Sequence, residues 1–151
     1  MMPLTLKTSK QYKAFLLLYI LFSMSQCYAF ESSEIEIYVH STVPDKQYSL
    51  ADVRAIFAMR TKHWSDGSKI RVFVLPDDAP LHRQFTKSKL NMFPHQFRRM
   101  WDRLIFSGTG QAPEEVESHD AMLKKIETIP GAIGYLKKQS INANIRIINY
   151  E

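Results

Sequence analysis

Two hydrophobic periodicities alternate along this chain, and that alternation restricts its fold more than any other feature. Residues 32–40 alternate between a buried face, which includes Ile37 and Val39, and a face toward solvent, which includes Tyr38. This period of two predicts a β-strand. Residues 50–57 then place apolar side chains at three- and four-residue steps, as an amphipathic helix does. Because the two patterns go on alternating, the sequence predicts a single α/β domain with a mostly parallel mixed sheet flanked by helices.

Turn and capping residues set the boundaries of the expected elements. Ser49 with Asp52 three residues later predicts a capped helix start. Asp66-Gly67 predicts a tight turn before a buried strand over residues 70–75, and Pro80 fits the first turn of the next helix. The other expected elements are a helix beginning near residues 91–94, a short strand over 114–118, a helix after Ser118 or His119 that Pro130-Gly131 closes, and strands over 132–136 and 145–150.

The first 29 residues have the organisation of a secretory signal peptide. Three lysines precede an apolar run over residues 14–22, and Cys27 and Ala29 place small residues three before and one before a cut after Ala29. The run is about half the ~20 residues that a membrane-spanning helix needs, so we expect no stable transmembrane anchor. A retained anchor is therefore a weaker alternative. A lipoprotein attached through Cys27 is also weaker, because Gln26 is large and polar for a lipid-attachment site. Residues 30–151 are the expected mature domain, periplasmic or secreted.

Removal of the signal peptide changes the charge balance. It takes away three of the 20 lysines and arginines and none of the 15 acidic residues, which leaves 17 against 15 and a net charge of +2. So small a charge argues against a nucleic-acid partner, which requires a concentrated basic face. The single cysteine is also lost, which excludes a disulfide and a thiolate metal site, and the five histidines lack the spacing of metal ligands. We expect no metal and no cofactor.

Three stretches, in order along the chain, resemble one known family. They are residues 50–57 followed by Trp64-Ser65-Asp66-Gly67, then Trp101-Asp102-Arg103-Leu104-Ile105-Phe106-Ser107-Gly108, and finally Pro130-Gly131-Ala132-Ile133-Gly134-Tyr135-Leu136. They resemble the periplasmic phosphate-binding-protein-like family, which comprises the substrate-binding proteins of phosphate ABC transporters and short single-domain relatives. The family fold is a pair of α/β lobes that close on an anion. The resemblance therefore implies a single lobe of this kind, with an open binding shelf.

The resemblance also implies where an anion would bind, and the sequence departs from the family there. Full receptors have an arginine, an acid and Gly-Ser-Gly-Thr between a strand and a helix, so that backbone N–H groups approach the oxyanion closely. Residues 75–83 of this chain lack those glycines and hydroxyls and carry Asp77 and Asp78 instead. The candidate ligand-binding residues are His82 and Arg83 in the helix start, and Ser107, Gly108 and Thr109 in a glycine-rich loop.

The segment between these two candidates carries both apolar and basic side chains. Helical spacing places Phe97, Trp101 and Phe106 in the core. The basic side chains form either a solvated face or a surface for anionic lipid headgroups, lipopolysaccharide or an acidic partner. These side chains are Lys87, Lys89, Arg98, Arg99 and Arg103.

No catalytic constellation is visible, because the adjacent carboxylates of Asp77 and Asp78 are poorly placed to act together on one substrate. The sequence predicts an exported, non-catalytic module of the solute-binding type, whose ligand is phosphate or another small oxyanion. The alternative is an envelope interaction or assembly protein that keeps the lobe without ligand binding. Its partner would be an envelope protein or a second copy of the chain.

Overall fold

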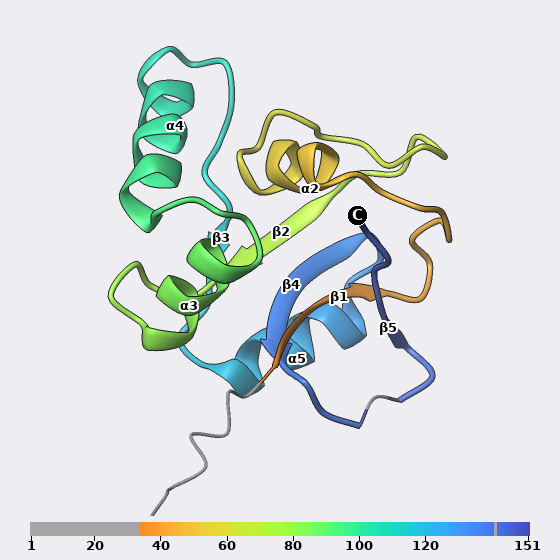
Figure 1. Ribbon diagram of the computed structural model, residues 1–151. Helices are drawn as coiled ribbons and strands as arrows, with labels where there is room; N and C mark the ends of the chain where they lie inside the picture. The colour runs from red at the N-terminus through yellow and green to blue at the C-terminus, as the bar shows by residue number, and fades with distance from the viewer. Residues whose placement is uncertain (1–33, 141) are drawn as a thin grey trace, which may run out of the picture. The chain divides into compact units, whose positions relative to one another are not determined.

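A mixed five-stranded sheet forms the centre of the computed structural model, which describes residues 34–140 and 142–151 (Figure 1). The predicted signal peptide lies outside these residues. Strand order in the sheet is β3-β2-β4-β1-β5. The elements are β1 (Ile35–His40), α2 (Leu50–Phe57), β2 (Arg71–Val74), α3 (Pro80–Ser88), α4 (Pro94–Phe106), β3 (Glu114–Glu115), α5 (His119–Thr128), β4 (Ala132–Lys137) and β5 (Ile145–Ile147).

The predicted α/β fold is confirmed, and strand pairing shows how the sheet is mixed. β2 pairs in parallel with both β3 and β4, whereas β1 pairs antiparallel with both β4 and β5. The parallel part is thus the β3-β2-β4 half, where α3, α4 and α5 make the connections. Alternating periodicity predicts the type of each element but not its direction, so the antiparallel half could not be foreseen.

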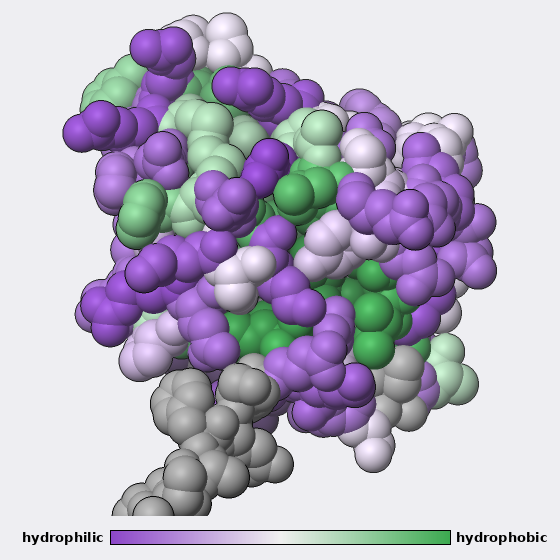
Figure 2. All heavy atoms as spheres, viewed as in Figure 1, coloured by the Kyte–Doolittle hydropathy of each residue, from purple (hydrophilic) through white to green (hydrophobic). Residues whose placement is uncertain are grey.

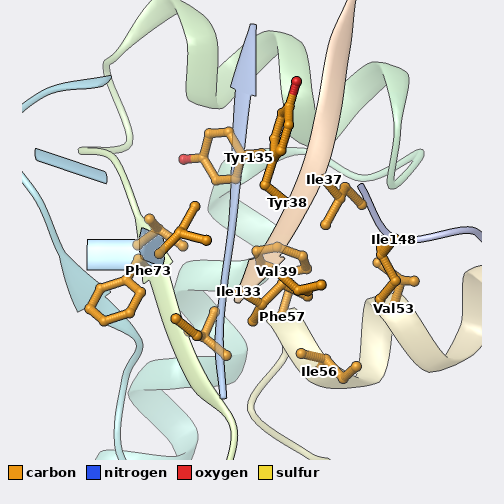
Figure 3. Close-up of a cluster of buried hydrophobic side chains, with 14 of the residues drawn as sticks. Ile37, Tyr38, Val39, Val53, Ile56, Phe57, Phe73, Ile133, Tyr135 and Ile148 are labelled. Atoms are coloured by element: carbon orange, nitrogen blue, oxygen red, sulfur yellow. The ribbon is translucent and has the colours of Figure 1, made fainter. Parts of the chain in front are cut away.

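Helices cover both faces of the sheet. On one face, α5 lies so close to β4 that a Cβ on Gly134 would come within 2.9 Å of Ile126 Cδ1. On the other face, Tyr135 stacks on Phe85 of α3 with ring centroids 3.8 Å apart and meets Phe57 of α2 at 6.2 Å. Figure 3 shows the side chains of α2 pointing at those of β1 and β4. The two covered faces make one continuous apolar core.

The predicted position of Tyr38 on the solvent-facing side of the first strand is wrong. Ile37 and Val39 are buried as expected, but the Tyr38 side chain is also fully buried. Tyr38 pairs with Gly134 across β1 and β4, so its ring lies on the face that α5 covers. The missing side chain of Gly134 lets Ile126 and Met122 of α5 approach this face closely. Period two predicts the strand but does not exclude a helix over its second face.

Predicted caps hold the ends of the helices. The Ser49 hydroxyl accepts a hydrogen bond from the Asp52 N–H (3.1 Å), and an Asp52 carboxylate oxygen accepts one from the Ser49 N–H (3.0 Å), which forms a capping box. Ser118 caps α5 through the Ala121 N–H. Gly131 follows α5 with φ +74°, a left-handed conformation that favours glycine.

The apolar residues of α4 have different fates. Phe97 and Trp101 are buried, as predicted, and the indole N–H of Trp101 donates to the Phe57 carbonyl (2.9 Å). Phe106 is 89% exposed, so its predicted core position is wrong. At about 100° per residue, a position five residues past Trp101 points roughly 140° away from it. Within residues 34–140 and 142–151, no helix is long and apolar enough to cross a membrane.

Candidate functional site

The carboxyl ends of the parallel strands meet at one edge of the sheet, and polar side chains gather there. Asp77 follows β2, Glu115 ends β3, and Tyr135 lies in β4, next to the start of α3. In open α/β sheets, ligands bind outside this edge. It is also the edge at which the sequence predicts an anion site, because residues 75–83 connect β2 to α3. We call it the carboxyl edge.

A buried chain of hydrogen bonds occupies the inner part of the carboxyl edge. The Tyr135 hydroxyl accepts from the Leu75 N–H (2.8 Å) and lies 2.5 Å from His82 Nδ1. The Tyr135 hydroxyl donates its one proton to Nδ1. The proton of the neutral His82 imidazole is therefore on Nε2. Nε2 lies 3.7 Å from an Asp77 carboxylate oxygen, too far for a hydrogen bond. His82 is therefore an interior residue, 1% exposed, and does not face a ligand.

Burial controls the protonation of these groups. It lowers the pKa of His82 from its ordinary 6.5 to about 4, although the nearby Asp77 carboxylate acts in the opposite direction. Burial also raises the pKa of the Tyr135 hydroxyl far above its usual range. Both side chains are consequently neutral at pH 7. They fix the start of α3 against β4 and are not placed to exchange protons with a substrate.

Arg98 of α4 neutralises the outer part of the carboxyl edge. Its Nε donates to Asp77 (2.8 Å) and its Nη2 to Glu115 (3.4 Å), and the hydrogen bond to Asp77 raises the pKa of Arg98. An oxyanion at this position would compete with two carboxylates for one guanidinium. The edge thus satisfies its own charges at the position where the resemblance implied an anion site.

The structure separates His82 from Arg83. The α3 helix has Ala79 at its N-cap, which provides no side-chain cap, and Pro80 at its first position supplies no N–H. The N–H groups of the first helical turn have no partner within the helix. Arg83 is exposed and forms no ion pair in the described part of the chain. At the carboxyl edge, Arg83 and these N–H groups remain as the possible anion contacts.

The predicted loop donors are used within the end of α4. The N–H groups of Ser107, Gly108 and Thr109 donate to helix carbonyls at 3.0–3.1 Å, and the Ser107 hydroxyl donates to the Arg103 carbonyl (2.7 Å). Exposed carbonyls make a helix C-terminus partially negative, which disfavours an anion. The loop also begins nine residues past Arg98, about 14 Å along the helix. The structure therefore does not bring residues 107–109 together with His82 and Arg83.

A groove between α2 and α4 is the feature that sequence reasoning missed. It has a cavity volume of about 260 Å³. Arg99 and Arg103 were visible as a pair at i and i+4, but nothing in the sequence linked them to Arg60, which follows α2. The groove, called the α2–α4 groove below, is lined by Ala58, Arg60, Arg99, Met100, Arg103 and Leu104.

Comparison with known proteins rests on solved structures, because no family model and no curated protein matches the sequence. A phosphate ABC transporter substrate-binding protein of Clostridium perfringens, solved with bound phosphate, superposes with a TM-score of 0.60 at 13% identity. The chain has the fold of a phosphate-receptor lobe. A phosphate transport receptor of Vibrio cholerae and PstS of Borrelia burgdorferi each give 0.57 at 13% identity.

The matches cover much more of this chain than of the receptors. Each covers 77% of this chain but only 44%, 45% and 46% of the three receptors, in the order given. The chain thus spans less than half the length of the receptors it matches. The predicted resemblance is confirmed at the level of the fold.

Proposed function

We propose that this phosphate-receptor lobe is a non-catalytic binding module for a small oxyanion such as phosphate. The observation that carries the proposal is the shared fold, which extends over 77% of the chain. One of the receptors with this fold was solved with bound phosphate. The buried, hydrogen-bonded state of His82 and Tyr135 supports a role without catalysis, because both side chains are committed to the interior.

Titration calorimetry of the purified protein with phosphate and sulfate tests this function. We expect saturable binding, and no heat at millimolar anion would refute it. Arg83→Gln tests the carboxyl-edge prediction in the same assay. Loss of a charged hydrogen bond from Arg83 would weaken binding about tenfold or more. Thr109→Val tests the loop, where we expect no change because the Thr109 hydroxyl already bonds to the Ser107 hydroxyl (2.7 Å).

We further propose that the chain is exported and cleaved after Ala29. The support is the order of lysines, apolar run and small residues described above. Intact-mass measurement of the protein from the periplasmic fraction would give a chain beginning at Phe30. An uncleaved mass, or a chain beginning at a lipid-modified Cys27, would contradict this proposal.

The second candidate is an envelope interaction or assembly protein. It is favoured by the exposure of large apolar side chains at the end of α4, namely Phe106 (89%) and Ile105 (50%). Photo-crosslinking from position 106 in the intact envelope would capture a defined partner or a second copy. Crosslinking from exposed Gln84 of α3 is the matched control. A monomer with no position-specific product would count against this candidate.

A further inference from the structure

Three arginines line the α2–α4 groove without a carboxylate to neutralise them. Arg99 and Arg103 lie one turn apart on α4, and Arg60 approaches from the end of α2 with its Nη2 3.9 Å from Met100 Sδ. No acidic residue lines the groove, and none of the three arginines has a carboxylate within 4.0 Å in the described part of the chain. Arg98, one residue away, is bound to two carboxylates. The groove therefore gathers three uncompensated positive charges, whereas the carboxyl edge has Arg83.

The floor of the same groove is apolar. Met100, Leu104 and Ala58 supply it, between arginines whose side chains are exposed. Figure 2 shows hydrophobic and hydrophilic side chains interleaved over the α4 region. A ligand that fits this surface has an anionic group for the guanidinium groups and a small apolar part for the floor. At about 260 Å³, the cavity lies just below the size of sites that hold drug-sized ligands.

We propose that the α2–α4 groove binds an organic phosphate ester, with the phosphate on Arg60, Arg99 and Arg103 and the apolar part against Met100 and Leu104. Guanidinium groups suit this role because their planar N–H forks match phosphate oxygens two at a time. This inference rests on the proposed anion-binding function and assigns that function a site other than the carboxyl edge. The ester can be soluble or the headgroup of an anionic lipid.

Two soluble probes test the site and the ligand class. Phenyl phosphate and inorganic phosphate are titrated into the protein carrying ¹³C-labelled methionine methyl groups. We expect phenyl phosphate to bind at least fivefold more tightly, because only its ring reaches the apolar floor. The Met100 methyl signal should shift on binding, whereas that of Met122, which belongs to α5 and is buried against β4, should not. Equal affinities for the two probes, or an unmoved Met100 signal, would overturn the assignment.

A charge-matched pair of variants separates the groove from the carboxyl edge. Arg99→Gln with Arg103→Gln should weaken phenyl phosphate binding at least tenfold. Lys46→Gln with Lys124→Gln removes the same charge from exposed positions that line neither site and should leave the affinity unchanged. If Arg83→Gln weakens binding and the Arg99→Gln, Arg103→Gln variant does not, the groove is not the site but the proposed function stands. If the unmodified protein binds neither probe, both proposals fail.

Vesicles distinguish the two sources of the ester. Sedimentation with phosphatidylglycerol vesicles, compared with phosphatidylcholine vesicles, measures recognition of a lipid headgroup. Binding to phosphatidylglycerol vesicles that is lost in the Arg99→Gln, Arg103→Gln variant would assign the groove to a membrane lipid. Binding of phenyl phosphate without vesicle binding would assign it to a soluble ester. Vesicle binding that is unchanged in the Arg99→Gln, Arg103→Gln variant would count against the groove.

Discussion

Acid should destabilise this protein through His82. The unfolded chain binds a proton at this imidazole with the ordinary pKa of 6.5, whereas burial lowers the folded value to about 4. Unfolding therefore takes up a proton between these pH values, and the free energy of unfolding falls as the pH drops through that window. The full difference is about 3 kcal/mol, and about 2 kcal/mol of it is lost between pH 7.5 and pH 5.0.

Urea unfolding at pH 7.5 and pH 5.0 measures this loss while most carboxylates remain ionised. With an m-value of about 2 kcal/mol/M, the midpoint should fall by about 1 M. His82→Gln removes the titrating group, so most of this pH dependence should disappear, whatever the variant's own stability. His95→Gln, at an exposed position, should behave as the unmodified protein. Equal losses of stability in the unmodified protein and in His82→Gln would refute the reasoning.

Three further stability predictions follow from the packing, and urea unfolding checks each of them. Gly131→Ala should lower the free energy of unfolding by at least about 3 kcal/mol, because its Cβ would lie within 2.3 Å of the Lys69 carbonyl oxygen. Gly108→Ala, at a similar positive φ but in open space, should lower it by about 1 kcal/mol. Equal losses in the two variants would contradict this. Exposed Phe106→Ser should change the free energy of unfolding by less than about 0.5 kcal/mol, whereas buried Phe97→Ala should lower it by about 3 kcal/mol. Comparable losses would mean that Phe106 is buried. Ser49→Ala should cost about 1 kcal/mol by removing one half of the capping box, and an unchanged midpoint would argue that the cap contributes nothing.

Local signals account for what the sequence predicted well. Ser49 and Ser118 mark helix starts because a cap acts within three residues, and alternation identifies β1 because strand periodicity is local. The errors arose where a distant element decides burial. Tyr38 is covered by α5, which follows it by about 80 residues, and Phe106 lies past the last turn of α4 that meets the core.

The candidate site shows the same limit more sharply. The resemblance implied an anion site at the carboxyl edge, and the missing glycines indicated that this edge is not an ordinary anion cradle. The contact of His82 with Tyr135 spans 53 residues and that of Arg98 with Asp77 spans 21, so neither could be inferred from spacing. The α2–α4 groove likewise needs Arg60 from the segment after α2 and Arg99 from α4. Long-range pairing of charges therefore decides which cations remain available to a ligand.

The position of β1 has a consequence for the order in which the chain acquires its structure. Both neighbours of this first strand come from the end of the chain, since Ile35 pairs with Lys137 and His40 pairs with Ile145. Closing such distant contacts is slow, because a loop of about 100 residues must be ordered first. The sheet therefore has no centre until nearly the whole polypeptide has been synthesised. For the export that we propose, this delay would keep the chain threadable through a translocation channel, with its final assembly postponed to the far side.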